Sequence, residues 1–174
     1  MSQALPETVD AWRMVQARRH FEGSLPLAAM PRLAADLAST AGAVDFELEF
    51  GKDQFGVAFL HVRARTALPL TCQRTLAEFE LPVAIDTRLG LIADEAAEAG
   101  LPPGYEPLLI SDGSLRPADV IEDELILATP SVPVKPGTQY VERLWGDADD
   151  AAEPEQEQAQ RNPFAALKKM KSSR

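Results

Sequence analysis

A chain of 174 residues, 45% of them hydrophobic, is long enough for one domain and a tail, or for two small domains at most. Its formal net charge is −10, which argues against a simple nucleic-acid binder, because nucleic-acid affinity comes largely from cation–phosphate contacts. The single cysteine, Cys72, excludes an intramolecular disulfide and indicates a reducing compartment. With no secretory signal and no run of roughly 18 apolar residues, the sequence predicts a soluble cytoplasmic protein.

Two segments before the first predicted strand show helical features. Residues 7–20 form either a short helix or an extended arm, and the basic cluster at 18–20 is more simply an exposed helix end than an RNA contact. Pro31 suits the first turn of a helix, since the N–H that proline lacks has no partner there. Apolar residues then recur at three- and four-residue spacing up to Gly42, so we predict an amphipathic helix over 29–40.

The next segments alternate strictly between apolar and polar residues, the pattern of half-buried strands. One strand is predicted over 44–50 and a second over 57–72, where the even-numbered positions are mostly apolar. A third strand is predicted over 76–92. Pro82 favours an edge position for it, because proline cannot donate a ladder hydrogen bond.

Three basic residues project from the polar face of the second strand: His61, Arg63 and Arg65. Their spacing would allow contacts with successive phosphates of an RNA. Cross-strand pairing with the acids of the first strand is the simpler interpretation, since opposite charges on neighbouring strands attract each other.

Residues 93–114 are acidic and rich in Pro and Gly, which predicts a long loop with a short strand near 108–111. Pro117 opens a second helix over 117–129. Its inner side is predicted to consist of Val120, Ile121, Leu125 and Ala128. Three consecutive acids lie near its start: Glu122, Asp123 and Glu124. They suit the positive end of the helix dipole, and the alternative is that they form a patch that binds a partner.

No catalytic constellation is evident. The two histidines are well separated, and there is neither a Gly-x-Ser-x-Gly elbow nor a glycine-rich phosphate loop. One cysteine and two distant histidines do not make the tetrahedral set that zinc needs. We therefore expect no enzyme activity, no metal, no cofactor and no small-molecule substrate; a hydrolase using His61 is a minor alternative.

The last thirty residues separate charge. Residues 145–160 hold six acids and no Lys or Arg, and residues 161–174 hold five cations and no acid. Composition predicts a disordered acidic linker followed by a short basic C-terminal peptide. In that peptide Asn162 can cap a helix and Pro163 can occupy its first position. Apolar residues recur every three positions at Phe164, Leu167 and Met170. So short a helix should order only on a partner.

Four stretches, taken in order, carry a family resemblance: Leu70–Thr75, Leu101–Pro107, Ile121–Val134 and Asn162–Lys168. The first contains Cys-Gln-Arg-Thr, and the third is an acidic helix followed by a Pro-x-x-Pro exit. Together they resemble the YceD family, the bacterial large ribosomal RNA subunit accumulation proteins, whose core often reads Cys-Gln-Arg-Cys. Each stretch alone is unspecific, but the ordered set covers most of the chain.

The resemblance implies a cytoplasmic protein that is needed for accumulation of 23S rRNA, without known catalysis. Thr75 stands where the family's second cysteine often lies, and Lys135 and Tyr140 replace a His and a Cys of some relatives, so a metal is not expected here. Cys72 then remains as a small buried residue. Arg74 is the matching position expected to keep a role, in RNA contact or in a salt bridge with the acidic helix.

The predicted fold is α+β: a mostly antiparallel sheet covered by two helices. Residues 1–144 form the domain, and residues 145–174 form the linker and tail. The predicted function is a non-catalytic ribosome biogenesis factor that contacts large-subunit rRNA or a basic ribosomal protein. The alternative is a protein-binding adaptor or chaperone whose tail folds into a partner groove. The candidate contact residues are Arg63, Arg65, Arg74, Glu122, Asp123, Glu124, Asn162, Pro163, Phe164, Leu167, Lys168 and Lys169.

Overall fold

A computed structural model describes residues 5–137 of the chain. The strands are β1 (Val9–Asp10), β2 (His20–Pro26), β3 (Ala43–Lys52), β4 (Ala58–Thr71), β5 (Glu78–Ile92), β6 (Glu106–Leu109) and β7 (Ser114–Leu115). The α-helices are α1 (Ala11–Gln16), α2 (Pro31–Ala34) and α3 (Pro117–Ala128), and the 3₁₀ turns are η1 (Leu27–Ala29) and η2 (Glu95–Gly100). The expected α+β class is confirmed.

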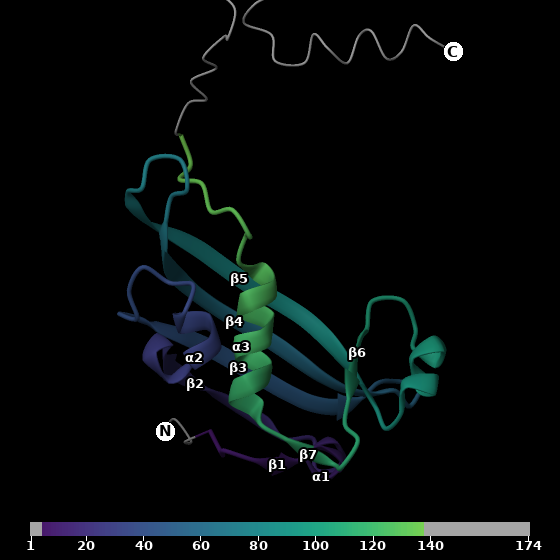
Figure 1. Cartoon of the computed structure of the whole chain (residues 1–174). Coiled ribbons are helices and arrows are strands. Elements are labelled where there is room, and N and C mark those ends of the chain that lie inside the picture. The colour runs from purple at the N-terminus through teal and green to yellow at the C-terminus, as the bar shows by residue number, and fades with distance from the viewer. Residues whose placement is uncertain (1–4, 138–174) are drawn as a thin grey trace, which may run out of the picture. The chain divides into compact units, whose positions relative to one another are not determined.

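Five strands form the main sheet in the order β2-β3-β4-β5-β6, and β1 pairs with β7 in a separate two-stranded ribbon. The first four strands of the main sheet are antiparallel to their neighbours, whereas β6 runs parallel to β5 (Figure 1). The three strands predicted over 44–50, 57–72 and 76–92 are confirmed as β3, β4 and β5, with small differences at their ends. The sheet is therefore a four-stranded meander with β6 added in parallel at one edge.

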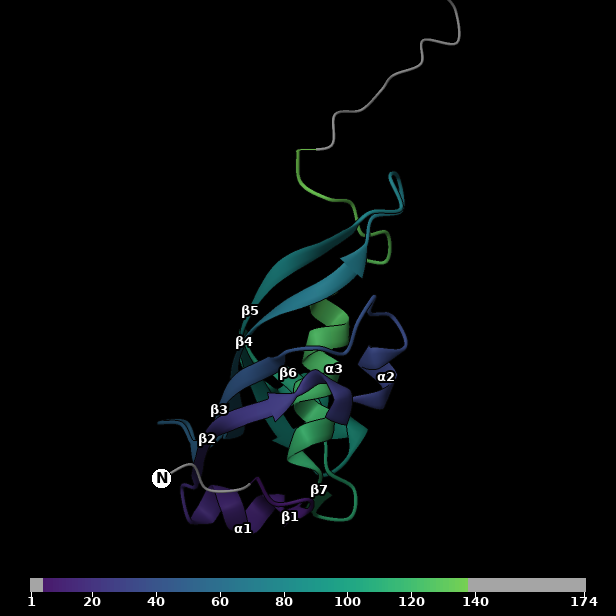
Figure 2. The ribbon, with the colours of Figure 1, turned by 90° about the vertical axis from the view of Figure 1, so that its left-hand side faces the viewer.

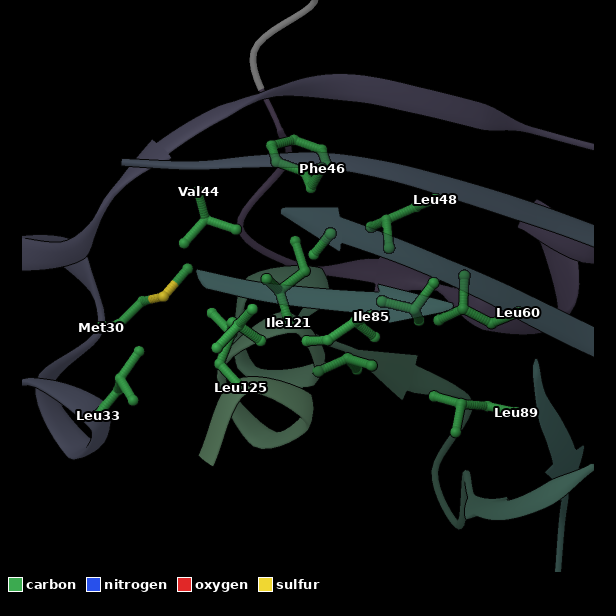
Figure 3. Close-up of a cluster of buried hydrophobic side chains, with 14 of the residues drawn as sticks. Met30, Leu33, Val44, Phe46, Leu48, Leu60, Ile85, Leu89, Ile121 and Leu125 are labelled. Carbon is green, nitrogen blue, oxygen red and sulfur yellow. The ribbon is translucent and has the colours of Figure 1, made fainter. Parts of the chain in front are cut away.

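One face of the sheet is covered by helices. Figures 1 and 2 show α3 lying across this face with α2 beside it. Side chains of alternate strand residues point at the helices, because successive residues of a strand face opposite sides. Figure 3 shows where they meet Ile121 and Leu125 of α3. The other labelled residues of this buried cluster are Met30, Leu33, Val44, Phe46, Leu48, Leu60, Ile85 and Leu89. Each fully buried Leu, Met or Phe contributes about 2 kcal/mol relative to an exposed position.

The prediction of α3 is confirmed in its bounds and wrong at one inward position. Pro117 opens the helix, and the Thr129 hydroxyl donates to the Leu125 carbonyl (2.8 Å) where the helix ends. Ala128, predicted to face inward, is exposed, because it lies beyond the last turn that reaches the sheet. Glu122 and Glu124 are buried instead.

The helix predicted over 29–40 is wrong. The chain makes the short turn η1 and then only the four-residue α2. Long-range hydrogen bonds replace the continuing helix: the Ala38 N–H donates to the Pro69 carbonyl of β4 (2.8 Å), and the Leu27 N–H donates to the Gly42 carbonyl (3.1 Å). Leu33 is nevertheless fully buried, as its apolar spacing predicted.

Strand β2 was not predicted. It pairs with β3 over its whole length, and its inward positions are Phe21, Gly23 and Leu25. A Cβ atom on Gly23 would lie 3.2 Å from the Phe46 ring, so the glycine makes room for that ring. The inward face of β2 therefore lacks an apolar side chain at its centre, and the apolar–polar alternation is too weak to predict a strand.

The edge position that Pro82 predicted holds for only part of its strand, because β5 lies between β4 and β6 in the sheet. Strand β6 pairs with β5 only from Leu89 to Ile92, and in the described residues the earlier part of β5 pairs on one side only, with β4. Proline is tolerated in such a segment, because the open side of the strand has no neighbour that needs an N–H donor. None of the helices within residues 5–137 is long and apolar enough to cross a membrane.

Candidate partner-contact surfaces

The open face of the sheet carries opposite charges in register. Strand pairing puts Arg63 opposite Glu47 and Arg65 opposite Asp45. The Arg63 guanidinium lies 2.6 Å from one Glu47 oxygen and 3.6 Å from Glu49. The interpretation of Arg63 as a cross-strand partner of the first strand's acids is thus confirmed.

The two histidines also face carboxylates on this surface. The His61 ring, 10% exposed, lies 2.5 Å from Asp86 of β5, and His20 lies 3.2 Å from Glu47. The hydrogen bond from His61 is the largest cause that lowers the pKa of Asp86 below its ordinary value. His61 therefore pairs toward β5 and not with Glu49, which lies opposite it on β3.

Arg65 is the most exposed of the three basic residues on β4. A hollow of about 520 Å³ surrounds it on the sheet surface, bordered by both acidic and basic side chains. The residues that line the hollow are Asp45, Phe46, Glu47, Arg63, Ala64, Arg65, Ala84, Ile85 and Asp86. This mixture of charges gives phosphate no uniformly positive track.

Glu122 joins α3 to α2. Its carboxylate, on a residue only 3% exposed, accepts hydrogen bonds from the backbone N–H groups of Arg32 (2.7 Å) and Leu33 (3.1 Å) and from the Arg32 Nε (3.0 Å). Burial by itself would raise the pKa of Glu122, but the hydrogen bonds from Leu33 and Arg32 outweigh it and lower the pKa. The acid therefore satisfies N–H groups at the start of α2 that have no partner within the helix.

The other two acids of α3 also have intramolecular partners. Asp123, about half exposed, lies 2.5 Å from the same Arg32 guanidinium. Glu124 is buried beside Thr87, whose side chain hydrogen-bonds to it; burial is the largest cause that raises the pKa of Glu124, and Glu106 adds to it. The prediction that these three acids lie near the start of α3 is wrong: they lie in its middle, and Asp119 is the acid of its first turn. Only Asp123 presents its carboxylate to solvent.

Cys72 lies at the start of the turn between β4 and β5. Its side chain is fully buried, as expected, and its Sγ accepts the Lys135 N–H at 3.4 Å. That bond, followed by one from the Thr75 side chain, lowers the pKa of the thiol to about 6. Arg74 lies in the exposed part of the turn. Across residues 5–137, no three His, Cys, Asp or Glu side chains lie close enough together to hold a metal ion.

The six candidate residues of the tail lie outside the described residues: Asn162, Pro163, Phe164, Leu167, Lys168 and Lys169. The boundary predicted between residues 144 and 145 and the substitution noted at Tyr140 also lie outside them. These predictions remain predictions.

The comparisons with known proteins give a family. A family model described as the large ribosomal RNA subunit accumulation protein YceD matches residues 60–171. The chain belongs to the YceD family. One similar protein is the large ribosomal RNA subunit accumulation protein YceD of Haemophilus influenzae, which is 26% identical over 168 residues that cover 96% of each chain. No solved structure matches the chain. The YceD match includes the Cys72 turn and α3.

Sequence reasoning found the partner of Arg63 but missed the partners of Glu122 and His61. Arg32 lies 90 positions before Glu122, and nothing in the local pattern of this YceD chain connects the two. Asp86 was within reach: the turn after Cys72 places Arg63 opposite Asp86, with His61 two residues away on the same face. Extending the predicted alternation across that turn would have shown the pairing.

Proposed function

We propose that this chain is a non-catalytic cytoplasmic factor that supports accumulation of the large ribosomal subunit's 23S rRNA, during its synthesis or its assembly into the subunit. The observation that carries the proposal is the YceD match over residues 60–171, together with a similar protein named for accumulation of the large ribosomal RNA subunit. Because that relative covers 96% of the chain, the proposal concerns the whole chain and not one segment.

The charges of residues 1–144 support attachment through protein more than through RNA. Residues 1–144 carry 12 Lys and Arg against 21 Asp and Glu, so the domain repels phosphate at long range. Two of its cations are already engaged: Arg32 lies 2.9 Å from Glu122, and Arg63 lies 2.6 Å from Glu47. An acidic body suits a basic ribosomal protein, and the five cations after residue 160 suit rRNA.

The proposal is tested by depleting the protein in growing cells. The expected result is a lower ratio of 23S to 16S rRNA and fewer large subunits in sucrose gradients, both restored by the full chain. Equal rRNA ratios in depleted and undepleted cells, at the same growth rate, would contradict the proposal.

A second candidate is an adaptor or chaperone for a basic ribosomal protein without direct RNA contact. The paired cations of the sheet face favour it, because they leave phosphate few partners there. RNA contact by the tail predicts rRNA binding that falls steeply with salt and is lost when residues 161–174 are deleted. The adaptor predicts that Phe164→Ala harms binding more than the double variant Lys168→Ala, Lys169→Ala.

A further inference from the structure

Exposed aliphatic side chains gather at one end of the β4–β5 hairpin. Leu76 in the turn is 76% exposed, and Val132 and Val134, which follow α3, are 64% and 38% exposed. Two hydrogen bonds hold these segments together: the Gln73 N–H donates to the Pro133 carbonyl (2.9 Å), and the Lys135 N–H donates to the Cys72 Sγ (3.4 Å). Figures 1 and 2 show the two segments side by side at this end. We call the set Leu76, Val132 and Val134, with Arg74 and Lys135, the hairpin-end patch.

Leu76 occupies an unfavourable backbone conformation. Its φ is +58°, in the left-handed region that glycine and asparagine adopt more readily than leucine. Its N–H donates to the Cys72 carbonyl (2.8 Å), so the turn itself requires this geometry. The turn imposes this conformation, and the side chain that it holds is 76% exposed and does not pack in the core. Together with Val132 and Val134 it forms an exposed aliphatic group, the kind of surface that marks a candidate contact site.

The patch differs in charge from most of the described domain. Residues 72–77 and 130–137 contain two cations, Arg74 and Lys135, and no acid, in a chain whose net charge is −10. Carboxylates or phosphates of a partner would complement these cations. The apolar part is aliphatic throughout, whereas proteins bind unpaired bases largely on aromatic side chains. Aliphatic side chains fit an apolar pocket of a protein better.

We propose that the hairpin-end patch docks a protein that presents an apolar pocket bordered by carboxylates, with Leu76 as the inserted side chain. The inference rests on the proposed function, since the docked protein belongs to the particles on which the large subunit forms. A hollow of about 280 Å³ lies next to the patch, and its wall is of mixed character, with Leu70 and Ile126 beside Asp36 and Gln73. Arg74 and Lys135, which both have further interactions within the chain, add positive charge beside the inserted side chain.

The test uses the full chain and purified large-subunit precursor particles as the probe. Leu76→Gly removes the side chain and suits the left-handed backbone, so it should bind at least ten-fold more weakly while its thermal midpoint does not fall. Val132→Ser, which leaves the turn untouched, should weaken binding several-fold. Phe55→Ala is the matched control: Phe55 is also 76% exposed but lies in the turn at the other end of β4, so binding should stay within two-fold of wild type.

A photo-crosslinker at position 76 identifies the occupant. Crosslinks to a protein of the particle support the proposal, provided that the site reached is apolar and bordered by acids. Crosslinks to rRNA or to a second copy of this chain overturn it, and so does wild-type binding by both Leu76→Gly and Val132→Ser. If the wild-type chain does not bind the particles, this inference is overturned, whereas the proposed function is overturned only by unchanged rRNA ratios in depleted cells. If the wild-type chain and both variants bind the particles equally well, the docking site is wrong and the proposed function is unaffected.

Discussion

The contact between α2 and α3 and the hairpin-end patch use conspicuous side chains in opposite ways. Glu122 is charged and has the chemistry of a partner-binding residue, yet it is 3% exposed and bonded to Arg32 and Leu33. Leu76 is apolar and has the chemistry of a core residue, yet it is 76% exposed. Residue type therefore does not identify a contact surface. What identifies it is whether the fold itself supplies the partner.

The largest effect is expected at Glu122. Glu122→Ala leaves two backbone N–H groups and the Arg32 guanidinium without their acceptor, so it should lower the free energy of unfolding by about 3 kcal/mol. Urea unfolding followed by circular dichroism measures the change. Asp123→Asn is the control, because Asp123 contacts the same guanidinium but is about half exposed; its loss should stay below about 1 kcal/mol. Equal losses of unfolding free energy in the two variants would contradict the view that the buried Glu122 contact stabilises the fold more than the exposed Asp123 ion pair.

The conformation of Leu76 predicts an unusual sign. Leu76→Gly relieves backbone strain in the folded state, which stabilises it, and gives the unfolded chain more freedom, which partly offsets that gain. The free energy of unfolding should therefore stay unchanged or rise by up to about 1 kcal/mol. Leu127 is equally exposed but lies in the regular helix α3, so Leu127→Gly should lose about 1 kcal/mol. Denaturant unfolding of the pair checks the prediction. A loss at Leu76 as large as that at Leu127 would mean that the leucine is not strained.

The sequence predicted those parts of the fold in which local pattern and tertiary structure agree. The alternation in β3, β4 and β5 survives because one face of each strand packs under helices. The helix predicted over 29–40 failed where Ala38 finds a better partner in Pro69 of β4, and such a bond between distant residues leaves no local signal. Strand β2 was missed because Gly23 interrupts its apolar face.

The candidate contact residues divide in the same way. Arg63 could be paired from the sequence, since its partner Glu47 lies on the neighbouring predicted strand. Burial of Glu122 could not be predicted, because it depends on how α2 docks on α3. Leu76 gave no signal either: a left-handed φ at a leucine follows from the closed geometry of its turn and not from its own preference.

Glu124 predicts a pH-dependent difference that Glu122 does not share. Burial raises the pKa of Glu124 above its ordinary 4.5, so its ionisation destabilises the folded state once the pH exceeds 4.5. Glu124→Gln should therefore stabilise the protein at neutral pH, by less than the changes expected for Glu122→Ala and Leu127→Gly. The gain should vanish below pH 4. For Glu122, whose pKa is lowered, the stabilisation is present at neutral pH and is lost as the pH falls below 4.5. Thermal unfolding of both Gln variants between pH 3.5 and pH 7.5 measures the two opposite slopes; parallel slopes would contradict the assignment.

The smallest effect on stability is expected on the open sheet face. There Arg63 is paired with an acid of the neighbouring strand, whereas Arg65 is exposed. Arg63→Gln removes an ion pair between half-exposed side chains, so the free energy of unfolding should fall by only about 0.5 kcal/mol, and less in high salt. Arg65→Gln should change it even less, because Arg65 is exposed at a hollow of mixed charge. If this face contacts RNA in spite of the pairing, Arg65→Gln should weaken rRNA binding more than Arg63→Gln does, whereas contact through the hairpin-end patch leaves both variants at wild-type affinity for precursor particles. Filter binding at two salt concentrations distinguishes these outcomes, because each phosphate contact that is lost lowers the salt dependence of binding.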